Sequence, residues 1–159
     1  MLELTAALGE TLVKKGLRIT TAESCTGGLV AAALVDYPGI SACLDEAHVT
    51  YANEAKVRYC KVKQETLDAH GAVSIETARE MAEGLREKAG ADIALATTGI
   101  AGPGGGTKEK PVGLVYVACA SEHETKVVRL QLSGDRRQVR EQTVRHALQM
   151  ALDAAKQYE

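Results

Sequence analysis

The sequence predicts an α/β protein built as a three-layer α/β/α sandwich, with a mixed sheet that includes a hairpin in its C-terminal half. Helical and strand patterns alternate along the first hundred residues. Two β-prone runs around the polar turn Ser-Glu-His-Glu then follow. The alternation favours a sheet with helices on both faces, and the two late runs favour an antiparallel hairpin. At 159 residues the chain has the usual size of one domain, so we expect a single domain over residues 1–159.

The individual elements follow from hydrophobic spacing and from helix and turn signals. Three leucines at helical spacing in residues 4–12 predict a first helix that ends at Gly16. Residues 92–98 are apolar with little alternation, which is typical of a strand covered on both faces. Asn53 is expected to cap a short helix that carries Lys56. Further strands are predicted over 18–21, 46–51, 112–118 and 125–132, and further helices over 29–34, 75–89 and from 135 onward.

Composition narrows the classes of partner. The 19 basic and 21 acidic residues leave a formal charge of −2, so we expect neither a nucleic-acid nor a membrane partner. The first sixteen residues lack the basic start and apolar run of a signal peptide, and no run approaches a membrane span. The four cysteines lack the paired spacing of a zinc site and the density of a disulfide scaffold. We therefore expect a cytoplasmic protein without a metal site.

The segment TAESCTGG, residues 21–28, places the Ser24 hydroxyl between the end of a predicted strand and a glycine pair that opens a helix. Such a junction exposes side chains and backbone N–H groups together, and the helix end favours developing negative charge. The segment lacks the GxSxG pattern of α/β-hydrolases. Ser24 or Thr26 is equally interpreted as a simple helix cap. Cys25 is a rival nucleophile, because a thiol is intrinsically better at attack.

The segment TYANEAK, residues 50–56, places Lys56 in the first turn of a predicted helix. A cation there opposes the helix dipole, which typically costs about 0.3–1 kcal/mol. That cost lowers a lysine pKa by less than about one unit, so a working base near pH 7–8 also needs desolvation. Burial near Ser24 would supply the desolvation, whereas a solvated lysine on a short helix is the simpler interpretation. Tyr51 is either a core residue or a residue that orients Lys56.

Two further segments predict ligand contact. The glycine-rich segment of residues 97–113 follows a predicted central strand and brings backbone close to a ligand, unless it is only a flexible hairpin loop. Its order of residues matches neither a P-loop nor a dinucleotide-binding loop. The first turns of the last predicted helix carry Arg136, Arg137 and Arg140. Cations there interact unfavourably with the helix dipole unless an anion or a carboxylate neutralises them. Phosphate binding is one interpretation, and a surface cluster of ion pairs is the other.

These segments together resemble the C-terminal domain of the CinA family. The resemblance runs from about Leu4 to the last helix. Its carriers, in order, are TAESCTGG, VTYANEAK, GAVSIETAREMAEG, TTGIAGPGGGTKEKPVG and SGDRRQVR. Stand-alone members of the family are nicotinamide-nucleotide amidohydrolases called PncC. The resemblance implies hydrolysis of the carboxamide of nicotinamide mononucleotide to nicotinic acid mononucleotide and ammonia. It implies a small-molecule nucleotide substrate, no cofactor and no metal. We also expect a homo-oligomer, with a dimer as one possibility.

The resemblance also implies the roles of the site residues. Ser24 is the expected nucleophile and Lys56 its base, with Tyr51 near both. Backbone N–H groups from Thr26 to Gly28 are expected to stabilise the oxyanion, while the glycine loop and Arg140 hold the ribose phosphate. The full set of expected substrate-binding residues is Thr26, Gly27, Gly28, Gly39, Asn53, Thr98, Gly99, Gly102 and Arg140.

The sequence departs from the family pattern beside this site. The family usually has a serine where Ala52 stands. It also tends to carry aromatic residues and a glycine in the segment that here contains Cys43, Leu44, Ala47 and His48. These departures motivate an alternative function, a regulatory module that binds the nucleotide without turnover.

Overall fold

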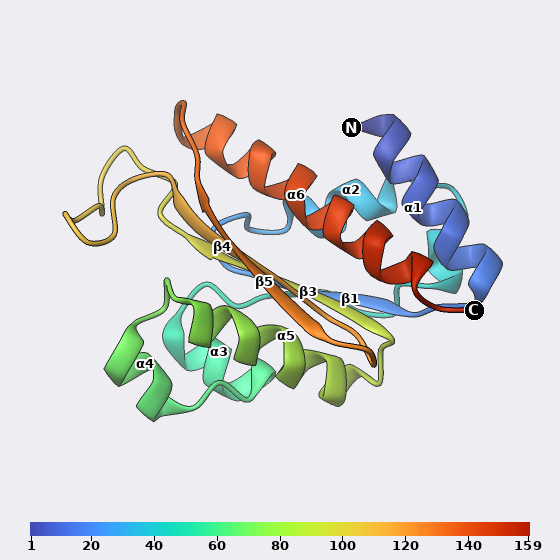
Figure 1. Ribbon diagram of the computed structural model, residues 1–159, viewed down its shortest axis with the longest axis horizontal. Helices are drawn as coiled ribbons and strands as arrows, with labels where there is room; N and C mark the ends of the chain where they lie inside the picture. The colour runs from blue at the N-terminus through green and yellow to red at the C-terminus, as the bar shows by residue number, and fades with distance from the viewer.

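The computed structural model describes residues 1–159 and contains a five-stranded mixed sheet (Figure 1). The strand order is β2-β1-β3-β4-β5. The strands are β1 (Ile19–Glu23), β2 (His48–Val49), β3 (Ile93–Gly99), β4 (Leu114–Ala120) and β5 (Thr125–Gln131). β2, β1 and β3 pair in parallel, whereas β3, β4 and β5 pair antiparallel, so β4 and β5 form a hairpin. The predicted α/β class and the predicted hairpin are confirmed.

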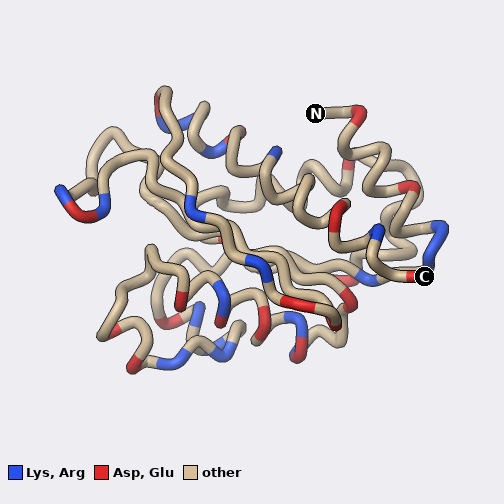
Figure 2. Tube along the Cα trace, in the orientation of Figure 1, with Lys and Arg blue, Asp and Glu red and all other residues tan.

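Helices cover both faces of the sheet (Figure 1). One layer contains α1 (Leu2–Lys15), α2 (Leu29–Val35) and α6 (Arg136–Lys156). The other contains α3 (Asn53–Cys60), α4 (Gln64–His70) and α5 (Ile75–Ala89), and a short 3-10 helix η1 (Ile40–Ala42) follows α2. Acidic and basic residues are interspersed along α3, α4 and α5 (Figure 2). No helix is both long enough and apolar enough to cross a membrane.

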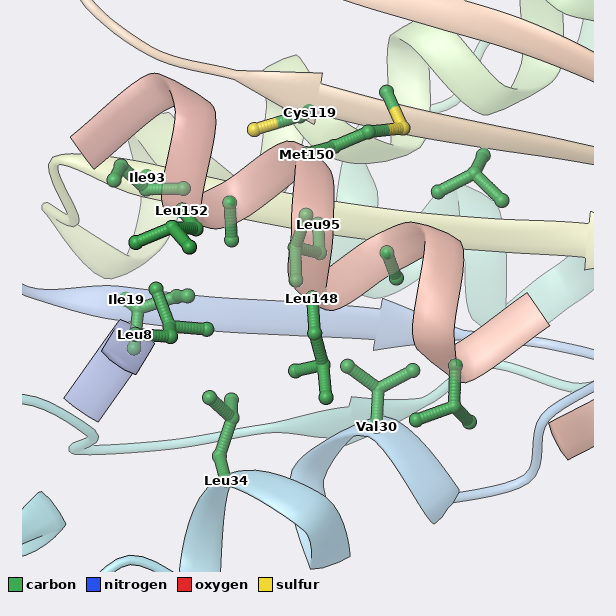
Figure 3. Packing of buried hydrophobic residues seen from close by; sticks show 14 of the residues in the cluster. Leu8, Ile19, Val30, Leu34, Ile93, Leu95, Cys119, Leu148, Met150 and Leu152 are labelled. Atoms are coloured by element: carbon green, nitrogen blue, oxygen red, sulfur yellow. The ribbon is translucent and has the colours of Figure 1, made fainter. Parts of the chain in front are cut away.

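Two hydrophobic clusters hold the layers together, one on each face of the sheet. Between the sheet and the α1, α2 and α6 layer, Leu8, Leu95 and Leu148 are almost fully buried (Figure 3). On the opposite face Met81 and Leu85 of α5 are buried against the sheet. Each such side chain contributes about 1.5–3 kcal/mol when it leaves water. Because β3 is buried on both faces, it is apolar without alternation, as predicted.

Several predicted helix ends are confirmed, and others are wrong. Gly16 ends α1 in the left-handed conformation, and the Ser74 hydroxyl caps α5 by accepting from the Thr77 N–H. The short helix α4 has no counterpart among the predicted elements, because Leu67 is its only buried residue and it has no side-chain cap. Asn53 does not cap α3. Ala52 is the N-cap, without a side-chain hydrogen bond, and Asn53 is the first helical residue, exposed to solvent.

The predicted strand over 46–51 is shorter than expected, because only His48 and Val49 pair with β1. The Thr50 N–H donates to the Glu23 carbonyl oxygen at 2.8 Å, and the Thr50 carbonyl oxygen accepts from Lys56. The backbone therefore leaves the sheet at Thr50 and turns directly into α3. This early departure brings α3 beside the end of β1.

The position of α3 depends on a close contact with α5 at Gly84. A Cβ atom at this residue would lie 1.7 Å from the Cys60 carbonyl oxygen. Only glycine allows the two helices to approach so closely.

We expect Gly84→Ala to destabilise the protein, although alanine is the better helix former. Overpacking of this kind typically costs about 1–3 kcal/mol, and backbone atoms yield less readily than a flexible side chain. The measurement is the free energy of unfolding in urea. Gly104→Ala is the matched control, because a Cβ at Gly104 meets no atom within 4 Å. Equal stability of the Gly84→Ala variant and the wild type would contradict the packing described here.

Candidate active site

The candidate site lies at the carboxyl ends of the three parallel strands. Ser24 follows β1 directly, the segment that leads to α3 follows β2, and the glycine-rich loop follows β3. The Ser24 N–H donates to the Thr97 carbonyl oxygen at 3.0 Å, which ties the residue to the end of β3. In open α/β sheets, ligands bind in the crevice outside the carboxyl ends of the strands.

Lys56 lies beside Ser24, with its Nζ atom 3.0 Å from the Ser24 Oγ atom. The lysine is only 1% exposed. Its other hydrogen-bond partners are the backbone carbonyl oxygens of Thr50, at 2.8 Å, and Tyr51, at 3.1 Å. Burial without a carboxylate partner lowers the pKa of Lys56, and this effect outweighs the opposing influence of the Cys60 and Cys25 thiols.

The three oxygen partners of Lys56 match the three N–H donors of an ammonium, and they also accommodate the neutral amine that a general base requires. A neutral amine has two N–H donors and one lone pair. The Thr50 and Tyr51 carbonyl oxygens take the two donors, which directs the lone pair toward the Ser24 hydroxyl. In this form Ser24 donates its O–H to the Lys56 Nζ atom. The pair therefore has the arrangement of a nucleophile and its general base.

Tyr51 contacts Lys56 through its backbone and not through its ring. The side chain is 61% exposed, so it is not a core residue. Its hydroxyl accepts from the Arg136 Nη2 atom at 3.2 Å. The backbone carbonyl oxygen accepts a hydrogen bond from the lysine, and Tyr51 is one of the residues that line a cavity.

Cys25 is a weaker nucleophile here than its position beside Ser24 indicates. It is 6% exposed, and burial raises the pKa of its thiol to about 11. At neutral pH the group is therefore the protonated thiol, whereas attack requires the thiolate.

The turn that follows Ser24 is held by Glu23, a residue that the sequence interpretation missed. The Thr26 hydroxyl donates to the Glu23 Oε1 atom at 2.5 Å, and the Gly28 N–H donates to the same oxygen at 3.2 Å. The Gly27 N–H donates to the Ser24 carbonyl oxygen at 3.1 Å. Two of the donors expected for the oxyanion, at Gly27 and Gly28, are therefore already engaged. The sequence does contain a signal for this role, because an acidic residue stands shortly before a glycine pair and a predicted helix start.

The backbone N–H groups of Cys25 and Thr26 donate no hydrogen bond within the chain. They belong to the two residues that follow the Ser24 nucleophile. In serine hydrolases the residue after the nucleophile commonly supplies an oxyanion donor. Thr26 is fully buried and does not line the cavity described below, whereas Cys25 does, so the Cys25 N–H is the group of the two that lies beside open space.

A cavity of about 230 Å³ opens beside this turn. Its lining residues come from the turn, the α3 approach, the glycine loop and the start of α6. They are Cys25, Tyr51, Gly99, Ile100, Ala101, Gly102, Gly104, Gly105 and Arg136. The backbone N–H groups of Ala101, Gly102 and Gly104 make no hydrogen bond within the chain. A larger cavity of about 660 Å³ between Met1 and α6 shares no residue with this one.

Two arginines of α6 have different surroundings in this region. Arg136 donates to the Gly102 carbonyl oxygen at 2.8 Å and lines the cavity. Arg140 donates from Nε to the Cys25 carbonyl oxygen and from Nη2 to the Thr26 carbonyl oxygen, both at 3.0 Å. Arg140 thus braces the turn, and Arg136 is the arginine that faces the open space.

The other expected residues are only partly brought together. Gly99 and Gly102 line the cavity. The Thr98 hydroxyl donates to the Ala72 carbonyl oxygen at 2.8 Å, on the α5 side of the sheet. Gly39 begins η1 at the opposite end of α2 from the Ser24 turn, and neither it nor the exposed Asn53 lines the cavity.

Comparison with known proteins gives consistent matches. The family model of the CinA C-terminal domain matches residues 1–155. A CinA-like protein from Fusobacterium nucleatum is 55% identical over 137 residues, which cover 86% of this chain and 33% of that protein. A relative from Clostridium novyi is 55% identical over 146 residues, which cover 92% of this chain and 35% of that protein. Its name assigns it provisionally to the competence-damage inducible proteins. The chain thus spans about a third of the length of these curated relatives.

Solved structures agree with these sequence matches. The competence/damage inducible protein CihA from Agrobacterium tumefaciens superposes with a TM-score of 0.94 at 43% identity, over 96% of this chain and 94% of that one. The competence damage-inducible protein A from Klebsiella pneumoniae gives a TM-score of 0.94 at 40% identity, over 99% and 98% of the two chains. On sequence and fold together, this chain belongs to the CinA family and corresponds to its C-terminal domain.

Proposed function

We propose that the chain hydrolyses the carboxamide of nicotinamide mononucleotide to nicotinic acid mononucleotide and ammonia, with Ser24 as nucleophile and Lys56 as general base. The observation that carries the proposal is the 3.0 Å contact between Lys56 Nζ and Ser24 Oγ, made by a buried lysine without a carboxylate partner. Burial lowers the pKa of Lys56, which is the direction that a general base requires.

In the proposed reaction, the neutral Lys56 amine takes the Ser24 hydroxyl proton as the oxygen attacks the carboxamide carbon. The Cys25 N–H, which has no backbone acceptor within the chain and belongs to a residue that lines the cavity, donates to the resulting oxyanion. The tetrahedral intermediate collapses, and the Lys56 ammonium returns its proton to the leaving nitrogen, which departs as ammonia. Lys56 then takes a proton from a water molecule, which attacks the carbonyl carbon of the Ser24 ester. The Lys56 ammonium returns that proton to the Ser24 oxygen as the carboxylate product leaves.

The cavity provides for the anionic part of the substrate. Arg136 supplies a cation at its wall, and the loop from Ala101 to Gly105 supplies N–H groups without partners. Guanidinium and backbone N–H groups together are the usual ligands of a phosphate. We therefore assign the ribose phosphate to Arg136 and the glycine loop. Tyr51, which is exposed, is the aromatic residue among those that line this cavity.

Replacement of the nucleophile tests the proposal directly. We expect Ser24→Ala to lower ammonia release from nicotinamide mononucleotide by at least about 10³-fold, as is usual when a serine nucleophile is removed. Cys25→Ala keeps its backbone N–H and should retain more than about a tenth of the activity. The measurement is a coupled ammonia assay. Loss of activity only in Cys25→Ala would make the thiol the nucleophile, and binding of nucleotide by the wild type without ammonia release would make the chain a regulatory module.

The base role of Lys56 predicts the pH dependence. Protonation removes the lone pair, so kcat should fall about tenfold per pH unit below the pKa of Lys56 in the complex. Because burial lowers that pKa from the ordinary value of 10.5, the fall should begin at a lower pH than for a solvated lysine. Lys56→Arg, which keeps the charge but does not deprotonate, and Lys56→Met should both be inactive across the range. An active Lys56→Arg variant would rule out the base role.

The phosphate assignment predicts a selective effect of Arg136. We expect Arg136→Ala to raise KM for nicotinamide mononucleotide by about 10–100-fold, since a hydrogen bond to a charged group contributes about 1.5–3 kcal/mol. Turnover of nicotinamide riboside, which lacks the phosphate, should change little. Arg137→Ala is the matched control, because Arg137 pairs with Glu141 on the exposed face of α6. Equal effects on both substrates would contradict the assignment.

A further inference from the structure

Glu23 is a carboxylate that the proposed reaction does not use, and it is only 1% exposed. Its Oε1 atom accepts from the Thr26 hydroxyl at 2.5 Å, from the Gly28 N–H at 3.2 Å and from the Val30 N–H at 2.9 Å. Its Oε2 atom accepts from the Ala31 N–H at 3.0 Å. No lysine or arginine forms an ion pair with it. Hydroxyl and peptide dipoles at the start of α2 therefore hold its charge.

This arrangement differs from an ordinary helix cap. A helix start is usually capped by a side chain of the N-cap residue itself, as Ser74 caps α5. The N-cap of α2 is Gly28, which has no side chain to offer. The capping carboxylate instead comes from the last residue of β1, immediately before Ser24. The helix is thus fixed to the residue that precedes the nucleophile.

A hydrogen-bonded path leads from this carboxylate to the Ser24 backbone. The Thr26 hydroxyl, which donates to Glu23, lies 2.8 Å from the Thr97 hydroxyl. The Ser24 N–H donates to the Thr97 carbonyl oxygen at 3.0 Å and lies 3.4 Å from the Thr97 hydroxyl. All three side chains of the path are buried. These hydrogen bonds connect Glu23 and Thr26, on either side of Ser24, to Thr97 at the end of β3, and so restrict the backbone around Ser24.

The donors that Glu23 takes are separate from those left for the substrate. Glu23 engages the N–H groups of Gly28, Val30 and Ala31, while those of Cys25 and Thr26 stay free. We infer that Glu23 is a positioning residue. It holds the turn of residues 24–28 so that Ser24 Oγ meets Lys56 and the Cys25 N–H stays available to the substrate. The inference rests on the proposed serine mechanism, but not on the identity of the substrate.

The test measures the reactivity of Ser24 itself with a fluorophosphonate probe, which forms a covalent bond to an activated serine and releases fluoride. The extent of labelling at Ser24 is followed by mass spectrometry, beside the ammonia assay. In Glu23→Gln the amide places N–H donors against the Ala31 N–H, so the turn loses its fixed geometry. We expect labelling and kcat to fall together by at least tenfold, with KM and the pH at which activity falls little changed.

Two further variants separate positioning from stability. Thr26→Val breaks the path and should also slow labelling at least tenfold, whereas Thr26→Ser restores the hydroxyl and should recover most of the lost rate. Leu12→Ala removes a buried side chain of α1 that makes no hydrogen bond to the turn, and it serves as a control destabilised to a similar or greater degree. Well below its melting temperature it should label at the wild-type rate.

The possible results differ in what they overturn. A folded Glu23→Gln variant that labels as fast as the wild type would overturn the inference, and so would an equal loss of rate in Leu12→Ala. A wild type that takes the probe but releases no ammonia would overturn the substrate assignment and leave the role of Glu23 standing. A wild type that does not react with the probe would overturn the serine mechanism and the inference with it.

Discussion

The burial of Lys56 is the constraint on which the candidate site depends. An ammonium group removed from water without a carboxylate partner is costly, so burial lowers the pKa of Lys56. Two backbone carbonyl oxygens accept hydrogen bonds from the amine, and these carbonyls are available only because the chain leaves the sheet at Thr50. The close packing of α5 against the end of α3 at Gly84 fixes the position of the helix that carries Lys56. A short edge strand and one glycine thus help to place the lysine beside Ser24.

The two halves of the mixed sheet have different tasks. The parallel strands β2, β1 and β3 end at the same edge, and the loops that follow them bring Ser24, Lys56 and the glycine loop together. The antiparallel hairpin β4–β5 extends the sheet and packs against α5 and α6. Helix α6 begins beside the site, where its first turns supply Arg136 and Arg140. One face of its later turns is buried in the hydrophobic core.

The sequence predicts the architecture and the central pair, but not the details that depend on backbone direction. The TAESCTGG and TYANEAK segments indicated Ser24 and Lys56, and the structure places these two side chains in contact. The carbonyl partners of Lys56 carry no sequence signal, because every residue has a carbonyl group. Arg136 and Arg140 lie one helical turn apart on the same face, so spacing alone could not distinguish the arginine that lines the cavity from the one that braces the turn.

Glu23 shows the same limit in another form. In the sequence it is one acidic residue in a β-prone run, where a charged residue is usually interpreted as solvent-facing. Its burial becomes understandable only when the start of α2 is seen to lie beside the end of β1, so that peptide N–H groups surround the carboxylate. The predicted cap at Asn53 was wrong because asparagine favours the N-cap position, but α3 has Ala52 as its N-cap and Asn53 as its first helical residue.

The two hydrogen bonds from Arg140 to the Ser24 turn have a consequence for peptide orientation. In a planar trans peptide, the carbonyl and the N–H of the next residue point in opposite directions. When Arg140 holds the Cys25 carbonyl oxygen on the α6 side, the N–H of Thr26 must point away from α6. The arginine therefore opposes a flip of the peptide between Cys25 and Thr26, and it does so without contacting the Ser24 hydroxyl.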